Sequence, residues 1–248
     1  MKVEFPKIIN SFKHSFHLCE MKNIALGIFL FFLIQNATMA QTKPKLIYFG
    51  DPMCSWCYGF SPEFSETIES LGESFDYQFV MGGLRPYNQE QISGMEDFLK
   101  EHWHHVSDAS GQPFSYEILK TPDYVYDTEP PCRAVVTMRK LKPEVEFDYF
   151  KAIQSAFYFE NKNTNLTQTY VDLAVKFGLD ADIFRKEFES DEMKNAVKGD
   201  FSYSANVGVR GFPTVVLQNG DKYYMISNGY MKAEQVVQRC QNYLNSEN

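Results

Sequence analysis

The spacing of apolar positions predicts a strand, a turn and a helix early in the chain. Residues 45–49 are a short apolar and aromatic run of strand type, and the glycine and proline within 50–52 indicate a turn. Apolar side chains then recur at spacings of four and three over about 54–71, as on one face of a helix. A second strand-like run covers 76–81. Strand, helix and strand in this order are typical of one half of an α/β fold.

The middle of the chain is helical in pattern, and its end returns to strands. The predicted helices cover about 94–106, 131–141, 146–159, 166–177, 181–189 and 191–204. A segment rich in Ser, Pro, Gly and Asp at 108–128 predicts a loop between the first two. The last predicted elements are strands at 214–218 and 222–227, a hairpin turn at 219–221 and a helix at 232–244.

Two cysteines lie where the first predicted strand gives way to the first helix. Cys54 and Cys57 have C-x-x-C spacing. Cys54 is expected at a helix N-terminus, where unpaired N–H groups and the helix dipole favour a thiolate. Cys57, one turn inside the helix, can close a small disulfide ring with it. Thiol–disulfide exchange requires an exposed, readily ionised first thiol and a resolving partner, so the pair predicts a redox dithiol.

Zinc binding and a purely structural disulfide are the alternative interpretations of this pair. A zinc site needs a second cysteine pair or histidines at ligand spacing, but Cys132 and Cys240 are single and far apart. The histidines at 102, 104 and 105 lack the H-E-x-x-H spacing and suit an exposed helix face. A disulfide across two residues adds little to what the helix already holds. The sequence therefore predicts neither a metal nor an organic cofactor.

The first forty residues are expected to be an export signal. Residues 24–34 are an unbroken apolar run, too short for a comfortable membrane span and suited to the core of a signal peptide. Thr38-Met39-Ala40 is a small-x-small cleavage site, so cleavage is expected after about Ala40. Met21 stands where such a signal would begin, which leaves Met1 or Met21 as the start. A long N-region or an uncleaved anchor is the alternative, and a periplasmic location is the prediction.

Composition narrows the class of protein. The 248 residues are 44% hydrophobic, 23% charged and 16% aromatic, as in an ordered globular chain. The net charge of −8 and the lack of a basic stripe give no support for a nucleic-acid partner. Cleavage at the predicted site would remove Cys19 and leave four cysteines, too few for a disulfide-dense scaffold.

Two separate motifs resemble those of the thioredoxin superfamily. The segment 54–58 (Cys-Ser-Trp-Cys-Tyr) after a strand looks like its active site. The segment 207–217 resembles the loop in which a cis-proline precedes a central strand. The 155 residues between Cys57 and Pro213, mostly helical in pattern, make the chain similar to the DsbA-like family. More narrowly, 51–57 and 129–134 resemble the group related to FrnE; the resemblance covers roughly 45–243.

The resemblance implies an α/β, thioredoxin-like fold with an all-α insertion domain. The expected parts are an upstream extension at 1–20, a signal peptide at 21–40, a discontinuous thioredoxin-like domain at 41–86 and 200–248, and an inserted helical domain at 87–199. Two departures limit what carries over. Ser-Trp replaces the Pro-His of DsbA between the cysteines, so strong oxidising power is not implied. Phe212 is bulkier than the Val or Thr often found before the proline.

The cysteine pair and the resemblance together suggest roles for single residues. Cys54 is expected to be the attacking thiolate and Cys57 the more buried, resolving thiol. Ser55 is expected to tune the redox potential. The residues expected to dock substrate are Trp56, Phe212 and Pro213, on a loop that would add a strand to an extended polypeptide. Trp56 could instead be a plain hydrophobic cap and Phe212 a core residue, and the Phe212–Pro213 bond is expected to be cis.

Other residues keep two interpretations. Cys132 starts a helix after two prolines and is either a third thiol near the site or a buried residue of the helical lobe. Cys240 is expected to be an inert core thiol, with a Cys132–Cys240 disulfide as the alternative. Asp51 and Glu129 are either proton-accepting carboxylates near the pair or solvated turn and cap residues. The aromatic residues of 147–159 are expected in the core of the lobe, or along an apolar cleft.

These features predict an exported thiol–disulfide oxidoreductase that acts on cysteine-containing proteins through a mixed disulfide. Its redox partner and the direction of exchange are not written in the sequence. Two other functions stay open, because one fold hosts many activities. One is a glutathione-dependent isomerase or transferase on the same scaffold. The other is a chaperone-like binder without catalysis.

Overall fold

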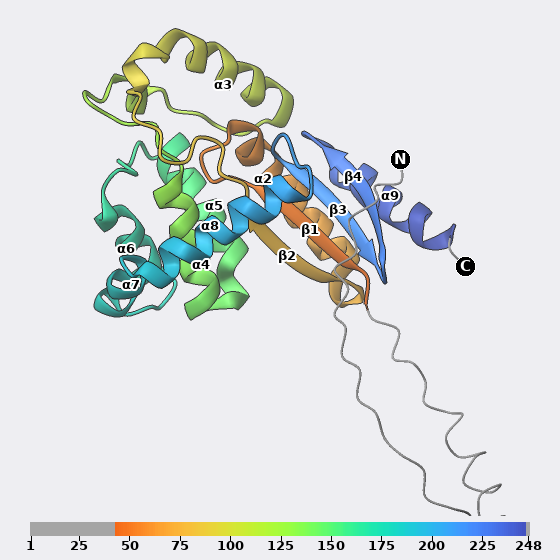
Figure 1. Cartoon of the computed structure of the whole chain (residues 1–248). Coiled ribbons are helices and arrows are strands. Elements are labelled where there is room, and N and C mark those ends of the chain that lie inside the picture. Colours follow the sequence, from red (N-terminus) through yellow and green to blue (C-terminus); the bar gives the residue numbers. More distant parts are fainter. Residues whose placement is uncertain (1–42, 247–248) are drawn as a thin grey trace, which may run out of the picture.

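A mixed sheet of four strands in the order β2-β1-β3-β4 forms the centre of the structure (Figure 1). The structure is a computed structural model and describes residues 43–246. β1 (Lys45–Gly50) and β2 (Asp76–Met81) are parallel. β3 (Thr214–Asn219) runs antiparallel to β1, and β4 (Lys222–Asn228) antiparallel to β3. The two halves of this sheet thus come from opposite ends of the chain.

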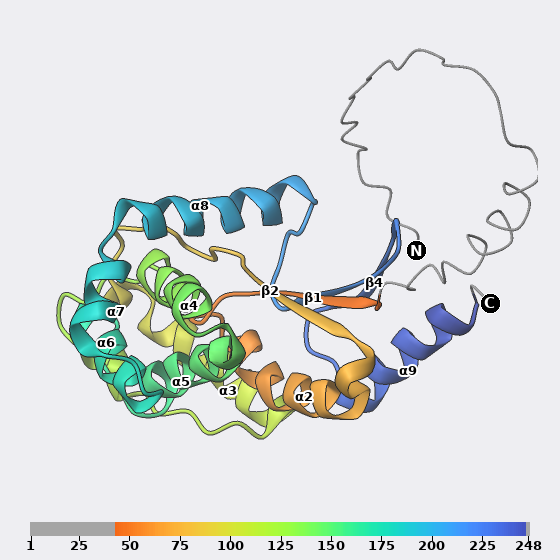
Figure 2. The ribbon, with the colours of Figure 1, turned by 90° about the horizontal axis from the view of Figure 1, so that it is seen from below.

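Helices cover both faces of the sheet, which is seen nearly edge-on in Figure 2. α2 (Ser55–Leu71) and α9 (Ala233–Asn245) lie on one face, and α8 (Asp191–Asn206) lies on the other. Successive side chains of β1 point to opposite faces. Tyr48 therefore joins the core beneath α2, whereas the Phe49 ring stacks on Tyr203 of α8 at 5.9 Å.

Between β2 and β3 the regular structure is helical, apart from one isolated bridge between Gln91 and Val125. The α-helices that precede α8 in this insert are α3 (Glu96–Ser110), α4 (Glu129–Leu141), α5 (Glu146–Tyr158), α6 (Thr167–Lys176) and α7 (Ala181–Phe188). α8 packs on both α4 and β2, so it joins the helical lobe to the sheet. The α/β fold with an all-α insertion is confirmed. The predicted boundary at 199 lies within α8.

The predicted elements all occur, with ends shifted by a few residues. The largest difference is α3, which continues to Ser110 into the segment predicted as a loop. The Ser110 hydroxyl donates to the Val106 carbonyl, and Gly111 then ends the helix in the left-handed conformation, at φ 76°. Short 3-10 helices also occur, and one of them interrupts the remaining loop. They span Gly72–Ser74, Ile92–Gly94, Glu117–Lys120 and Pro143–Val145.

A second apolar cluster joins α3 to the start of α2. Its centre is Trp103, which packs edge-on against Tyr158 at 5.0 Å between ring centroids. Met53 and Tyr58, on either side of the cysteine pair, belong to the same cluster. The turn that carries the cysteines is therefore held by the helical lobe as well as by the sheet.

The predicted extension, signal peptide and cleavage site fall in residues 1–42, outside the described part of the chain. Among residues 43–246, no helix is both long and apolar enough to span a membrane.

Candidate active site

The two cysteines of the C-x-x-C motif lie at the N-terminus of α2. Cys54 is the N-cap, and its sulfur accepts a hydrogen bond from the Cys57 N–H at 3.4 Å. The Cys54 N–H donates to the Asp51 carbonyl, which closes the turn after β1. Cys54 is 5% exposed and Cys57 is fully buried. Cys54 is thus the less buried of the two cysteines, although it is more covered than the exposed thiol that the sequence predicted.

The loop before β3 covers the first sulfur. The Phe212–Pro213 bond is cis, as predicted. The Cys54 thiol donates to the Phe212 carbonyl at 3.5 Å, across 158 positions of sequence. The Phe212 ring lies so close to Gly82 that a Cβ there would be 2.0 Å from it. Gly82 therefore makes room for this loop, a role that the glycine pair at 82–83 after a strand could have suggested.

Trp56 and Ser55, between the two cysteines, differ in their surroundings. Ser55 is buried and begins α2. Trp56 is half-buried. The centre of its ring lies 6.2 Å from that of His102 in α3 and 6.0 Å from that of Tyr230, which follows β4. The His102 ring in turn stacks on Phe98, which is 64% exposed. A row of rings thus leads from the cysteine motif to solvent, and the predicted docking role of Trp56 stays a prediction.

Asp51 is a buried carboxylate that ties three segments together. One oxygen accepts the Met53 N–H at 2.8 Å. The other accepts the Leu84 N–H at 2.6 Å and the Cys132 thiol at 3.4 Å. Burial raises the pKa of Asp51, although these hydrogen bonds oppose the rise. Asp51 thus lies near the cysteine pair, and its carboxylate fixes the turn that precedes Cys54.

Cys132 and Cys240 are buried, and all four described cysteines are free thiols. Burial, with the Asp51 carboxylate beside it, raises the pKa of Cys132 well above that of a free thiol. Burial raises the pKa of Cys240 to about 12. Both thiols therefore resist ionisation. The structure places Cys132 two hydrogen bonds from the turn of the redox pair, which favours an anchoring role over that of a third reactive thiol.

Two tyrosines that were not predicted to position the site hold the residue before Cys54. The hydroxyls of Tyr126 and Tyr158 both donate to the Met53 carbonyl at 2.7 Å. Tyr158 comes from α5, whose aromatic residues were predicted as core, and Tyr126 from the preceding loop. Both are buried, so Tyr158 is core and also positions the site. No local pattern marks Tyr126 for this role, because its partner lies 73 positions away.

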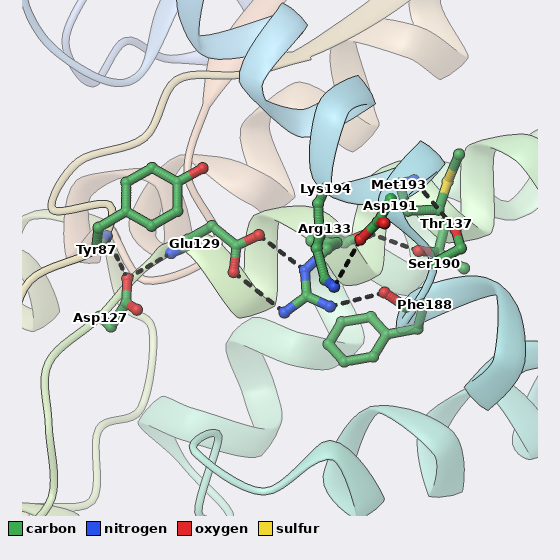
Figure 3. A network of polar contacts seen from close by, with 10 residues as sticks. All are labelled: Tyr87, Asp127, Glu129, Arg133, Thr137, Phe188, Ser190, Asp191, Met193 and Lys194. Atoms are coloured by element: carbon green, nitrogen blue, oxygen red, sulfur yellow. Dashed lines mark hydrogen bonds and ion pairs between the residues drawn. The ribbon is translucent and has the colours of Figure 1, made fainter.

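Glu129 points to a different set of partners (Figure 3). Its carboxylate accepts two hydrogen bonds from the Arg133 guanidinium, at 2.8 and 3.2 Å. Arg133 also donates to the Phe188 carbonyl at 2.7 Å. The central carbon of its guanidinium lies 4.0 Å from the centre of the Phe188 ring. The Asp127 carboxylate bridges the N–H groups of Tyr87 and Glu129. Glu129 is thus held in an ion pair within α4, and its partner Arg133 joins that helix to the end of α7.

Metal binding finds no support in the described residues, since 43–246 contain no group of three or more His, Cys, Asp or Glu side chains placed to hold an ion. The arrangement instead places one reachable sulfur above one buried sulfur, opposite the carbonyl of a cis-proline loop.

Comparison with known proteins identifies the family. A family model described as thioredoxin matches residues 143–237. A protein from Nitrosomonas europaea, described as a "putative protein disulfide isomerase", has a solved structure that is similar with a TM-score of 0.77 and 34% identity. The match covers 83% of this chain and 100% of that one. The chain belongs to the thioredoxin superfamily. Its fold is that of the DsbA-like structures.

More distant members share the fold. The cytosolic disulfide reductase DsbM of Pseudomonas aeruginosa is similar with a TM-score of 0.67 and 23% identity, over 82% of this chain and 98% of that one. The oxidoreductase DsbA of Xylella fastidiosa gives a TM-score of 0.54 and 15% identity, over 84% and 87%. At these identities the likeness shows only the fold. These three solved structures are thus described as a putative disulfide isomerase, a disulfide reductase and an oxidoreductase. The narrower resemblance to the group related to FrnE stays a prediction.

A curated relative has a different description. The ClpXP adapter protein SpxH of Halalkalibacterium halodurans is 22% identical over 186 residues, which cover 72% of this chain. The chain spans about 60% of the length of that relative. A DsbA-like chain can therefore resemble a protein that is described by its binding role rather than by redox catalysis.

Proposed function

We propose that this protein is an exported thiol–disulfide oxidoreductase that exchanges disulfides with cysteine-containing proteins through Cys54 and Cys57. The observation that carries the proposal is the position of the two sulfurs. Cys54 lies at the N-cap of α2, against the Phe212 carbonyl, and Cys57 is buried one turn behind it. Of the two cysteines only Cys54 has any exposed surface, so a partner would bond to its sulfur and Cys57 would attack that sulfur from within. This is the division of labour that exchange through a mixed disulfide requires.

The exchange proceeds in two steps. In the reducing direction the Cys54 thiolate attacks a substrate disulfide, bonds to one of its sulfurs and releases the other as a thiolate. Cys57 then attacks the Cys54 sulfur, the bond to the substrate breaks, and the substrate leaves as a second thiol. Two electrons pass from the cysteine pair to the substrate, and the reverse sequence oxidises a dithiol. The reduction potential of the pair decides which direction dominates.

The surroundings of Cys54 support a polypeptide as the substrate. Trp56, His102 and Phe98 form a row of rings that leads from the cysteine motif to solvent. The cis-proline loop lies opposite, with Phe212 half-buried over Gly82. Apolar surface next to a reactive sulfur suits an extended segment with apolar side chains near its cysteine. Docking by Trp56, Phe212 and Pro213 is part of this proposal.

A trapping experiment tests the mechanism. The wild type and the C57S and C54S variants, all with their thiols reduced beforehand, are mixed with a peptide that contains one disulfide, and the products are analysed by mass spectrometry after acid quenching. C57S should retain the peptide as a disulfide on Cys54, because the resolving sulfur is gone. C54S should give no adduct, and the wild type should release the peptide reduced. Absence of an adduct on Cys54 would rule out this mechanism.

A binding function is the second candidate, and the likeness to SpxH is the observation that favours it. It predicts that C54S still binds an unfolded client and suppresses its aggregation as well as the wild type does. Glutathione-dependent turnover that persists in C57S would instead indicate an isomerase or transferase. The same two variants therefore separate all three functions.

Export is proposed from residues 24–40 of the sequence. N-terminal sequencing of the protein purified from its native cells tests this part. A chain that begins near Gln41 and occurs in the periplasmic fraction agrees with export. An intact N-terminus in the cytosolic fraction would contradict it.

A further inference from the structure

The hydroxyl of Tyr48 is buried among rings that offer it no hydrogen-bonding atom. Tyr48 lies in the middle of β1, is fully buried, and its hydroxyl has no hydrogen-bond partner among the described residues. The rings around it all belong to phenylalanines, namely Phe60, Phe64, Phe79, Phe147 and Phe150. A buried hydroxyl without a partner destabilises the fold relative to a phenylalanine of the same shape. The presence of tyrosine therefore calls for a function of this hydroxyl.

The ring leans along β1 toward the end of the strand where the cysteines lie. Residues two apart in a strand share a face, so Tyr48 and Gly50 lie side by side. A Cβ on Gly50 would be 2.3 Å from a ring carbon of Tyr48 and 2.9 Å from its hydroxyl oxygen. Only glycine at 50 leaves room for this orientation. The hydroxyl thus reaches the end of β1, from which the chain turns into Cys54.

Cys57, Phe60 and Phe64 follow one face of α2, the rings of Phe60 and Phe64 pack on Tyr48, and Cys57 belongs to the same buried cluster. The hydroxyl at the end of β1 is therefore next to Cys57. Burial raises the pKa of Tyr48, and the neighbouring Cys57 raises it next, followed by Cys54 and Asp51. Burial likewise raises the pKa of Cys57, and Cys54 adds to the rise. Among the groups around Cys57, the Tyr48 side chain opposes this rise in the pKa of Cys57. The Tyr48 hydroxyl is a neutral donor at the same sulfur.

We propose that the Tyr48 hydroxyl donates a hydrogen bond to the Cys57 sulfur when that sulfur becomes the attacking thiolate, and so accelerates resolution of the mixed disulfide. The inference rests on the proposed function. In this step the Cys57 sulfur bonds to the Cys54 sulfur, the bond between Cys54 and the substrate sulfur breaks, and the proton lost by Cys57 ends on the departing substrate thiol. The cysteine pair is oxidised by two electrons and the substrate is reduced. The hydroxyl keeps its own proton throughout.

Ellman's reagent separates this step from the first attack. Cys54 of the reduced protein attacks the reagent, releases one coloured thionitrobenzoate and retains the other as a mixed disulfide. Cys57 then releases the second. Stopped-flow absorbance resolves the two phases, and the pH dependence of the second phase reports the ionisation of Cys57.

Tyr48→Phe removes only the hydroxyl. A hydrogen bond to a charged group changes an equilibrium constant by roughly tenfold or more. We therefore expect the second phase to slow by about tenfold and its pH midpoint to rise by about one unit, while the first phase keeps its rate. Tyr149→Phe is the matched control, since Tyr149 is also buried and donates to the Tyr170 carbonyl at 2.8 Å within the helical lobe. This control should leave both phases unchanged.

The outcomes separate the inference from the proposed function. A wild type that releases no second thionitrobenzoate from Cys57 would contradict the exchange mechanism itself. Two phases in the wild type, with an unchanged second phase in Y48F, would overturn only the role of Tyr48. If Y48F does not fold, a variant that carries 3-fluorotyrosine at position 48 is measured in its place. Its more acidic hydroxyl should lower the pH midpoint of the second phase, and an unchanged midpoint would equally overturn the inference.

Discussion

Replacing Asp51 with asparagine tests how the buried carboxylate holds the turn before Cys54. The carboxylate has two acceptor oxygens, which take the Met53 N–H, the Leu84 N–H and the Cys132 thiol. Asparagine of nearly the same volume has one oxygen and one NH2 group. In either orientation of the amide, one backbone N–H therefore faces another donor.

The expected magnitude follows from two opposing effects. A buried donor left without an acceptor costs about 1–3 kcal/mol. Removing a charge whose burial raises the pKa of Asp51 offsets part of that cost. We expect D51N to lower the free energy of unfolding by about 1–2 kcal/mol at neutral pH. This corresponds to a melting temperature lower by about 2–8 °C for a chain of this size.

Urea unfolding of the reduced protein, followed by tryptophan fluorescence, measures this loss. Asp127→Asn is the matched control, since its carboxylate also accepts two backbone N–H groups but is half-buried, where water can take over. D127N should lose less than about 1 kcal/mol. An unchanged or higher stability of D51N would refute the view that these hydrogen bonds hold the turn.

Three further predictions concern other parts of the fold. Burial raises the pKa of Glu146 to about 7, so its contribution to stability is complete below its ordinary pKa of about 4 and is lost as the pH rises through 7. The stability advantage of the wild type over E146Q should therefore shrink between pH 5 and 8 in melting curves, and a constant difference would contradict this. Gly82→Ala places a Cβ 2.0 Å from the Phe212 ring, so attack by Cys54 on a disulfide peptide should slow by about tenfold or more; a wild-type rate would show that the loop position is unimportant. Gly199→Ala, in the interior of α8 with open space around it, should raise the free energy of unfolding by about 0.5–1 kcal/mol in urea, and a loss would show that the site is strained.

Local patterns predict most of the fold. The period of apolar residues and the turn residues place the four strands and the helices within a few positions, because both depend on near neighbours in sequence. The extension of α3 to Ser110 escaped prediction, because a serine that bonds back to Val106 is common in loops as well as in helices. The approach of Phe212 to Cys54 was expected only because the two motifs resemble a known family.

The contacts that position the site were the hardest to predict. Asp51 meets Cys132 across 81 positions, and Tyr126 meets the Met53 carbonyl across 73. Neither pair leaves a periodic or compositional signal, since each depends on how the helical lobe packs against the start of α2. The burial of Cys54 also depends on a contact between distant parts of the sequence, because the cis-proline loop that covers it comes from the other end of the thioredoxin-like domain.

The reduction potential of the Cys54–Cys57 pair tests the central claim most directly. The purified protein is equilibrated in glutathione buffers of graded potential, its thiols are trapped with a mass tag, and peptide mapping locates the disulfide. We predict a reversible Cys54–Cys57 disulfide with a potential between about −270 mV, as in thioredoxin, and about −120 mV, as in DsbA. Two sulfurs that never bond to each other at any buffer potential would contradict the exchange mechanism.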